Sequence, residues 1–182
     1  IGYLLKPSSP VLSWERMSWA RIEEDINSVD FGGFDADLVV GVLSGGGFIR
    51  HIVARQFPKA DKGLIRSQVW SRISASENIR SVGQVFSDKE QWRSSKCKEL
   101  RWFAEPAKKK YSRILVVDDS VSSGKTMQNV LRFVRSEYPA ATVKCFVLYA
   151  PPASSGGAAA FVDFVCHRGH VPLLWPWGCE MD

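Results

Sequence analysis

The segment from residue 114 to residue 126 constrains the fold more than any other part of the chain. Four apolar residues, Ile114 to Val117, precede Asp118 and Asp119, and a run of small and polar residues then ends at Thr126. An uninterrupted apolar run is typical of a strand that is covered on both faces in a parallel sheet. Because side chains alternate along a strand, at least one of the two acids must enter the cleft beyond its carboxyl end.

The residues that follow the acids are suited to binding an anion. They enter a helix expected over about 124–137 and offer free backbone N–H groups, hydroxyls and the positive end of a helix dipole. Gly124 lets the backbone approach a phosphate closely. Two neighbouring carboxylates can accept hydrogen bonds from a vicinal diol and help to hold Mg²⁺. The segment therefore predicts a ribose 5-phosphate site, with Asp118 and Asp119 as the catalytic and metal-binding acids and the phosphate held by Ser122, Ser123, Gly124, Lys125 and Thr126.

Two other interpretations of this segment are weaker. The Gly-Lys-Thr ending also closes a nucleotide P-loop, but the first glycine of that motif would then fall at Asp119. A turn that only caps a helix explains one aspartate, but not two aspartates beside a phosphate cradle.

Helical and strand patterns alternate along the chain. This alternation predicts an α/β fold with a doubly wound, mostly parallel sheet, in which ligands bind beyond the carboxyl ends of the strands. The glycine-rich run 44–47 follows the strand expected over 38–43, and it predicts a turn at the edge of the sheet where the carboxyl ends of the strands lie. The expected elements are a helix from an N-cap at Ser13 to about Val29, strands over 38–43, 114–117 and 143–149, and helices over 48–57 and 124–137.

The length of 182 residues and the 45% hydrophobic content fit a single domain over 1–182. The polar stretch 74–112 has less regular patterning, so it is either a small hood or lid insertion or a surface excursion. A net charge of +5 comes from scattered basic residues, with one tight run at 108–110, so a nucleic-acid partner is not expected.

No apolar stretch approaches the roughly 20 residues that a bilayer span needs, and residues 1–10 lack a signal-peptide pattern. Whether a leader segment precedes Ile1 is left open. The cysteines show no C-x-x-C spacing, which favours reduced thiols and a cytoplasmic location. Cys166, His167, His170 and Cys179 could supply zinc ligands, although their spacing matches no standard zinc finger.

Residues 114–126 resemble the phosphoribosyl-pyrophosphate signature of the type I phosphoribosyltransferases. Ser13-Trp14, Val147-Leu148-Tyr149 and Pro176-Trp177 are similar to motifs of the small bacterial and archaeal xanthine and hypoxanthine enzymes. The resemblance implies transfer of ribose 5-phosphate from 5-phosphoribosyl-1-pyrophosphate (PRPP) to a nucleobase, with a purine favoured, with Mg²⁺ as cofactor and with a homodimer as one possible assembly. It further implies a pyrophosphate loop at Ser44, Gly45, Gly46 and Gly47, and a base pocket near Val121, Leu173, Trp175 and Trp177.

Three positions depart from the family pattern. Ser44 stands where the family often has a basic residue, Ser122 where the 6-oxopurine enzymes usually carry an aspartate, and Pro172 where they carry a base-stacking aromatic. We expect Arg50 to add charge near the pyrophosphate, with Arg66, Arg72 and Glu180 as weaker candidates for contact with pyrophosphate or a second metal. The departures leave a second function open, namely a non-catalytic regulator that binds PRPP.

Overall fold

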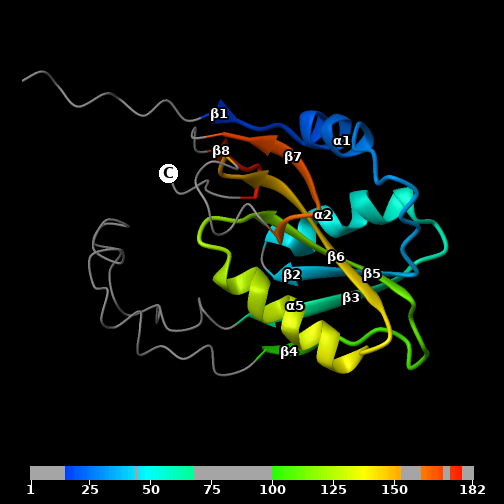
Figure 1. Cartoon of the computed structure of the whole chain (residues 1–182). Helices are drawn as coiled ribbons and strands as arrows, with labels where there is room; N and C mark the ends of the chain where they lie inside the picture. The colour runs from blue at the N-terminus through cyan, green and yellow to red at the C-terminus, as the bar shows by residue number, and fades with distance from the viewer. Residues whose placement is uncertain (1–14, 44, 68–99, 153–160, 170–172, 178–182) are drawn as a thin grey trace, which may run out of the picture.

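The computed structural model describes residues 15–43, 45–67, 100–152, 161–169 and 173–177 (Figure 1). Its centre is a six-stranded sheet in the order β4-β3-β2-β5-β6-β7, and every neighbouring pair is parallel except β3 and β4. A separate parallel pair joins β1 (Glu15–Arg16) to β8 (Leu173–Leu174). The six strands are β2 (Leu38–Leu43), β3 (Asp61–Ser67), β4 (Leu100–Ala104), β5 (Arg113–Ser120), β6 (Thr142–Ala150) and β7 (Phe164–Arg168).

The order of the strands places a topological switch point between β2 and β5. Helix α2 (Gly45–Val53) and the short 3₁₀ helix η1 (Ala54–Gln56) lead from β2 outward to β3. Helix α5 (Lys125–Glu137) leads from β5 outward to β6 in the opposite direction. In open α/β sheets such a reversal creates a crevice beyond the carboxyl ends of the two central strands.

Alternating strand residues bury two hydrophobic cores, one on each face of the sheet. On one face, Val40 and Val116 pack with α5 through Met127 and Val130, all fully buried. On the other face, Val39, Leu115 and Phe146 pack with α2 and with α1 (Trp19–Asn27). Both faces are thus covered, with α5 in front of the sheet and α2 behind it in Figure 1, as the uninterrupted apolar strands require.

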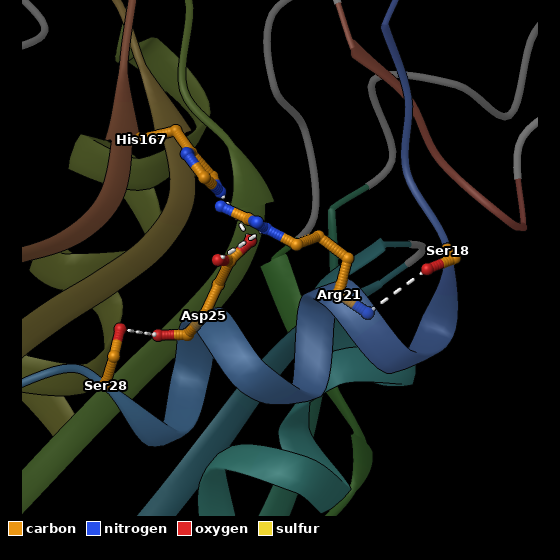
Figure 2. A network of polar contacts seen from close by, with 5 residues as sticks. All are labelled: Ser18, Arg21, Asp25, Ser28 and His167. Carbon is orange, nitrogen blue, oxygen red and sulfur yellow. Dashed lines mark hydrogen bonds and ion pairs between the residues drawn. The ribbon is translucent and has the colours of Figure 1, made fainter.

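A polar network fixes α1 to the edge strand β7 (Figure 2). The carboxylate of Asp25, which is 8% exposed, lies 2.6 Å from Nε2 of His167 and 2.9 Å from Nε of Arg21. Ser18 caps the helix by accepting a hydrogen bond from the Arg21 backbone N–H, at 3.2 Å. At the other end, the hydroxyl of Ser28 donates to the carbonyl oxygen of Asp25, at 2.7 Å. Residues far apart in the sequence thus hold the first helix against the last strand of the sheet.

The predicted fold class is confirmed, whereas several predicted boundaries are wrong. Helix α1 begins after Ser18 and not after Ser13, because residues 15 and 16 pair with β8. Helix α2 begins at Gly45, inside the run that the sequence indicates is a turn. Of the segment 74–112, residues 100–104 form β4 in the main sheet, and residues 74–99 lie outside the described residues. Within the described ranges, no helix has the length and apolar character to cross a bilayer.

Candidate active site

The two acids of β5 lie against the first turn of α2. Oδ1 of Asp118 accepts hydrogen bonds from the backbone N–H of Gly46, at 3.2 Å, and from that of Asp119, at 2.9 Å. A Cβ on Gly46 would lie 2.2 Å from the carbonyl oxygen of Val117. The glycine therefore allows the start of α2 to sit directly over the end of β5. The switch point between β2 and β5 thus brings together the two loops that the sequence placed at one edge.

The carboxylate of Asp119 is held on both of its oxygens. Oδ2 accepts a hydrogen bond from the indole Nε1–H of Trp177, at 3.2 Å, and Oδ1 accepts one from the hydroxyl of Ser120, at 3.2 Å. The same carboxylate rests on Gly45, where an added Cβ would lie 1.8 Å from Oδ2. Residue 45 must lack a side chain for the acid to occupy this place.

Burial makes it energetically unfavourable for both acids to be ionised at once. It raises the pKa of Asp118 well above its usual range, and the neighbouring charge of Asp119 raises that pKa further. Burial also raises the pKa of Asp119, although the hydrogen bonds from Trp177 and Ser120 oppose this shift. A bound cation or hydroxyl donors would offset the repulsion between the carboxylates, so the pair is suited to a diol or a divalent ion.

The start of α5 forms an open cradle beside the acids. Gly124 is the N-cap residue, with a left-handed φ of 76°, and no side chain caps this end of the helix in the described structure. The first backbone N–H groups of a helix have no intrahelical partner, so they can bind an anion. Ser122 and Ser123 are exposed at this end, and Thr126 is half-buried. The predicted phosphate-binding residues are therefore together at the helix start, one loop away from the acids.

The sequence matches the family model of the phosphoribosyl transferase domain over residues 15–178 of the 182-residue chain. The chain belongs to the phosphoribosyltransferase family. No curated protein sequence is detectably similar to it.

Solved structures share the fold at low sequence identity. The purine phosphoribosyltransferase from Pyrococcus horikoshii Ot3 is 15% identical, with a TM-score of 0.63 over 91% of this chain and 93% of that one. The xanthine-guanine-hypoxanthine phosphoribosyltransferase from Helicobacter pylori is 16% identical, with a TM-score of 0.62 over 93% of this chain and 96% of that one. A hypothetical protein from Neisseria gonorrhoeae with bound ppGpp is 13% identical, with a TM-score of 0.55 over 93% and 92% of the two chains.

Not every predicted site residue lies at the switch point between β2 and β5. Arg50 is 8% exposed and donates from Nη1 to the carbonyl oxygen of Gly63, at 3.0 Å, so its charge is directed at β3 and not at the loop. Arg66 lies over the ring of Phe103, with 5.8 Å between Cζ and the ring centroid. Val121 is 5% exposed and packs in the core beneath α5, which leaves little of its side chain for a base. Outside the described residues lie Ser44, Arg72, Pro172, Glu180 and the side chain of Leu173.

An aromatic cluster borders the acids, and the sequence predicted only part of it. Trp177 stacks on Trp175 with ring centroids 5.3 Å apart, and on Phe48 of α2 with centroids 5.6 Å apart. Trp19 of α1 completes the cluster, 5.2 Å from Trp177. Phe48 is 50% exposed and Trp19 is 46% exposed. The only signal for Phe48 was its place one residue after the glycine run, which does not specify contact with the C-terminal tryptophans.

The acids fit the way in which proteins bind Mg²⁺. Across the residues that the structure describes, no group of three or more metal-binding side chains is present. Mg²⁺ needs no such group, because it is usually held by one or two carboxylates together with substrate phosphates and water. Asp118 and Asp119 are the side chains that could hold the ion here. Of the residues of the zinc alternative, His167 contacts Asp25 through Nε2, and His170 and Cys179 lie outside the described residues.

Proposed function

We propose that this phosphoribosyltransferase transfers ribose 5-phosphate from PRPP to a nucleobase and releases pyrophosphate. The observation that carries the proposal is the placement of Asp118 and Asp119 beside the uncapped start of α5, at the switch point of the sheet. A ribose 5-phosphate presents a diol and a phosphomonoester on one small molecule, as two adjacent sites of this kind require. The acids would accept hydrogen bonds from the diol, and the cradle would bind the phosphate.

The first turn of α2 would face the pyrophosphate. Gly45, Gly46 and Gly47 open this helix, and the first amides of a helix point outward as donors. The N–H of Gly46 already holds Asp118, so this turn would also orient the acid that meets the sugar. Binding of pyrophosphate and of ribose would thus share one rigid junction between α2 and β5.

In the proposed reaction, the bond between C1 of the ribose and the pyrophosphate oxygen breaks while a ring nitrogen of the base bonds to C1. The pyrophosphate leaves with the electron pair of the broken bond, and the base nitrogen loses its proton to solvent or to pyrophosphate. Positive charge develops on the sugar in the transition state, so fixed carboxylates and fixed donors supply most of the catalysis. Ser122 cannot act as a carboxylate base, so the protein itself contributes no general base at that position.

A purine is the favoured acceptor for two reasons. Two of the solved structures with this fold are purine phosphoribosyltransferases, each matched over more than 90% of this chain. The exposed aromatic rings of Phe48 and Trp19 both contact Trp177, which donates to Asp119, so a flat base could stack on this cluster.

The test is a pyrophosphate-release assay with PRPP, Mg²⁺ and a panel of hypoxanthine, xanthine, guanine, adenine, uracil and orotate. We expect turnover with at least one purine and none in the Asp118→Asn, Asp119→Asn double variant. Turnover with a pyrimidine alone would overturn the purine preference. Absence of turnover with every base would overturn the enzyme assignment.

A second candidate function is a regulator that binds PRPP or a guanine nucleotide without turnover. Two observations favour it: Ser122 in place of the usual aspartate, and the similarity in fold to a protein with bound ppGpp. Tight binding of PRPP or ppGpp in calorimetry, without release of pyrophosphate for any base, would establish it. Turnover with any base would exclude it.

A further inference from the structure

Trp177 joins three segments that are distant in the sequence. Its indole N–H donates to Asp119 at the end of β5, with 3.2 Å between Nε1 and Oδ2. Its ring stacks on Phe48 in the first turn of α2, with 17° between the ring planes. The ring of Trp175, two residues earlier, also stacks on the Trp177 ring, with 3° between the planes. The C-terminal segment thus touches both the acid loop and the helix that opens with the glycine run.

The contacts of Trp177 indicate that it acts on Asp119 more than on a base. Its ring already stacks on two parallel neighbours, and its one hydrogen-bond donor is aimed at the carboxylate. Trp177 supplies the donor to Oδ2 of Asp119, the hydroxyl of Ser120 donates to Oδ1, and Gly45 has no side chain to restrain the acid. A carboxylate held on both oxygens keeps one rotamer and one direction for its remaining lone pairs.

We propose that Trp177 is a positioning residue, whose indole N–H fixes the Asp119 carboxylate in the orientation that accepts the ribose hydroxyls. The stacking on Phe48 ties this orientation to α2, so the acid and the pyrophosphate loop are aligned together. The proposal rests on the proposed function. Its effect falls on ligands that carry the ribose and not on pyrophosphate alone.

The test compares Trp177→Phe, which keeps a stacking ring and removes the N–H, with Trp102→Phe, which makes the same change on β4, where the ring contacts Phe133 and Tyr138. Calorimetry in the absence of divalent ions, where the metal-binding role of Asp119 does not enter, measures the affinity of each variant for PRPP, ribose 5-phosphate and inorganic pyrophosphate. A hydrogen bond to a charged group predicts about tenfold weaker binding of PRPP and ribose 5-phosphate by Trp177→Phe. Pyrophosphate binding should stay within about twofold, and Trp102→Phe should stay within about twofold for all three ligands, because its ring lies outside the aromatic cluster.

The other outcomes separate the two proposals. Equal weakening for all three ligands, or no weakening at all, would overturn the positioning role while leaving the proposed function in place. If the wild-type protein binds neither PRPP nor ribose 5-phosphate, the proposed function fails and this inference fails with it. A second measurement does not depend on the folding of a Trp177 variant. In protein with ¹⁵N-labelled indoles, the NMR resonance of the Trp177 Nε1–H should shift when Asp119 is changed to alanine (Asp119→Ala). An unshifted resonance would refute the contact.

Discussion

Gly45, Gly46 and Gly47 differ in what surrounds them, although they are adjacent in the sequence. A Cβ on Gly46 would meet backbone, at 2.2 Å from the carbonyl oxygen of Val117, and backbone in a buried sheet cannot move aside. A Cβ on Gly45 would meet the side chain of Asp119, and one on Gly47 would meet Cδ2 of Leu43, at 2.9 Å. A side chain at residue 46 would therefore disturb the backbone, and one at residue 45 would displace Asp119. A side chain at residue 47 would meet only a side chain that can shift.

Alanine substitutions should separate these roles. We expect Gly46→Ala to lower the free energy of unfolding by about 1–3 kcal/mol or more, because a new atom overlaps backbone. Gly45→Ala should lower it less and should instead weaken PRPP binding, because it displaces Asp119. Gly47→Ala should change it by less than about 1 kcal/mol, since the Leu43 side chain can shift. Urea unfolding and calorimetry give the two readouts, and equal destabilisation by all three variants would contradict the contacts described.

Two cysteines are predicted to be unreactive for a physical reason. Burial raises the pKa of the Cys145 thiol and that of the Cys166 thiol to about 12 each. At pH 8 only about one thiol in ten thousand would then be ionised, and the thiolate is the reactive form. Iodoacetamide at pH 8 should label both residues slowly in the native protein and fast in urea, as followed by peptide mass mapping. Fast native labelling of Cys145 would show that its strand is open to solvent.

At the scale of elements, the attachment of α1 depends on Asp25. Its carboxylate is nearly buried and contacts one partner on β7 and one on its own helix. The two partners differ in exposure, since the side chain of His167 is 31% exposed and that of Arg21 is 57% exposed. Figure 2 shows both side chains converging on the same carboxylate.

The two partners of Asp25 should therefore differ in their effect on stability. His167→Ala should lower the free energy of unfolding by about 1–3 kcal/mol, because a nearly buried carboxylate loses a donor. Arg21→Ala should lower it by less than about 1 kcal/mol, as expected for an exposed pair within one helix. Urea unfolding at pH 7 measures both changes. A larger effect of Arg21→Ala would mean that the helix is held by its own ion pair and not by β7.

Sequence patterns could predict the elements whose burial shows directly in their own hydrophobic periodicity. Apolar runs predicted β2, β5 and β6, and the periodicity after Gly124 predicted α5 within a residue. The start of α2 was missed because glycine has low helix propensity, and here tertiary contact with the acids overrides that propensity. Strand β4 was missed because one of its faces is exposed and it pairs antiparallel at the sheet edge.

At the scale of the whole molecule, the fold places the site where the chain reverses direction across the sheet. The shared position of the acids, the start of α5 and the glycine run was predictable, because each follows a buried strand and the carboxyl ends of parallel strands meet at one edge. The contacts of Phe48 and Trp177 were not predictable, since they depend on how the last described segment crosses the start of α2. Sequence patterns report local environment, whereas such contacts between distant segments depend on the complete chain path.

The most direct measurement of the central claim is calorimetric titration of PRPP with Mg²⁺ into the wild-type protein and into the Asp118→Asn, Asp119→Asn double variant. The variant keeps the size of both side chains, and thermal unfolding controls for its fold. We expect binding by the wild type and a loss of more than about a hundredfold in the variant, because both carboxylates that would accept from the ribose diol and hold Mg²⁺ are replaced by amides. Equal affinity of the two proteins for PRPP would contradict the assignment of this acid pair as the ribose site.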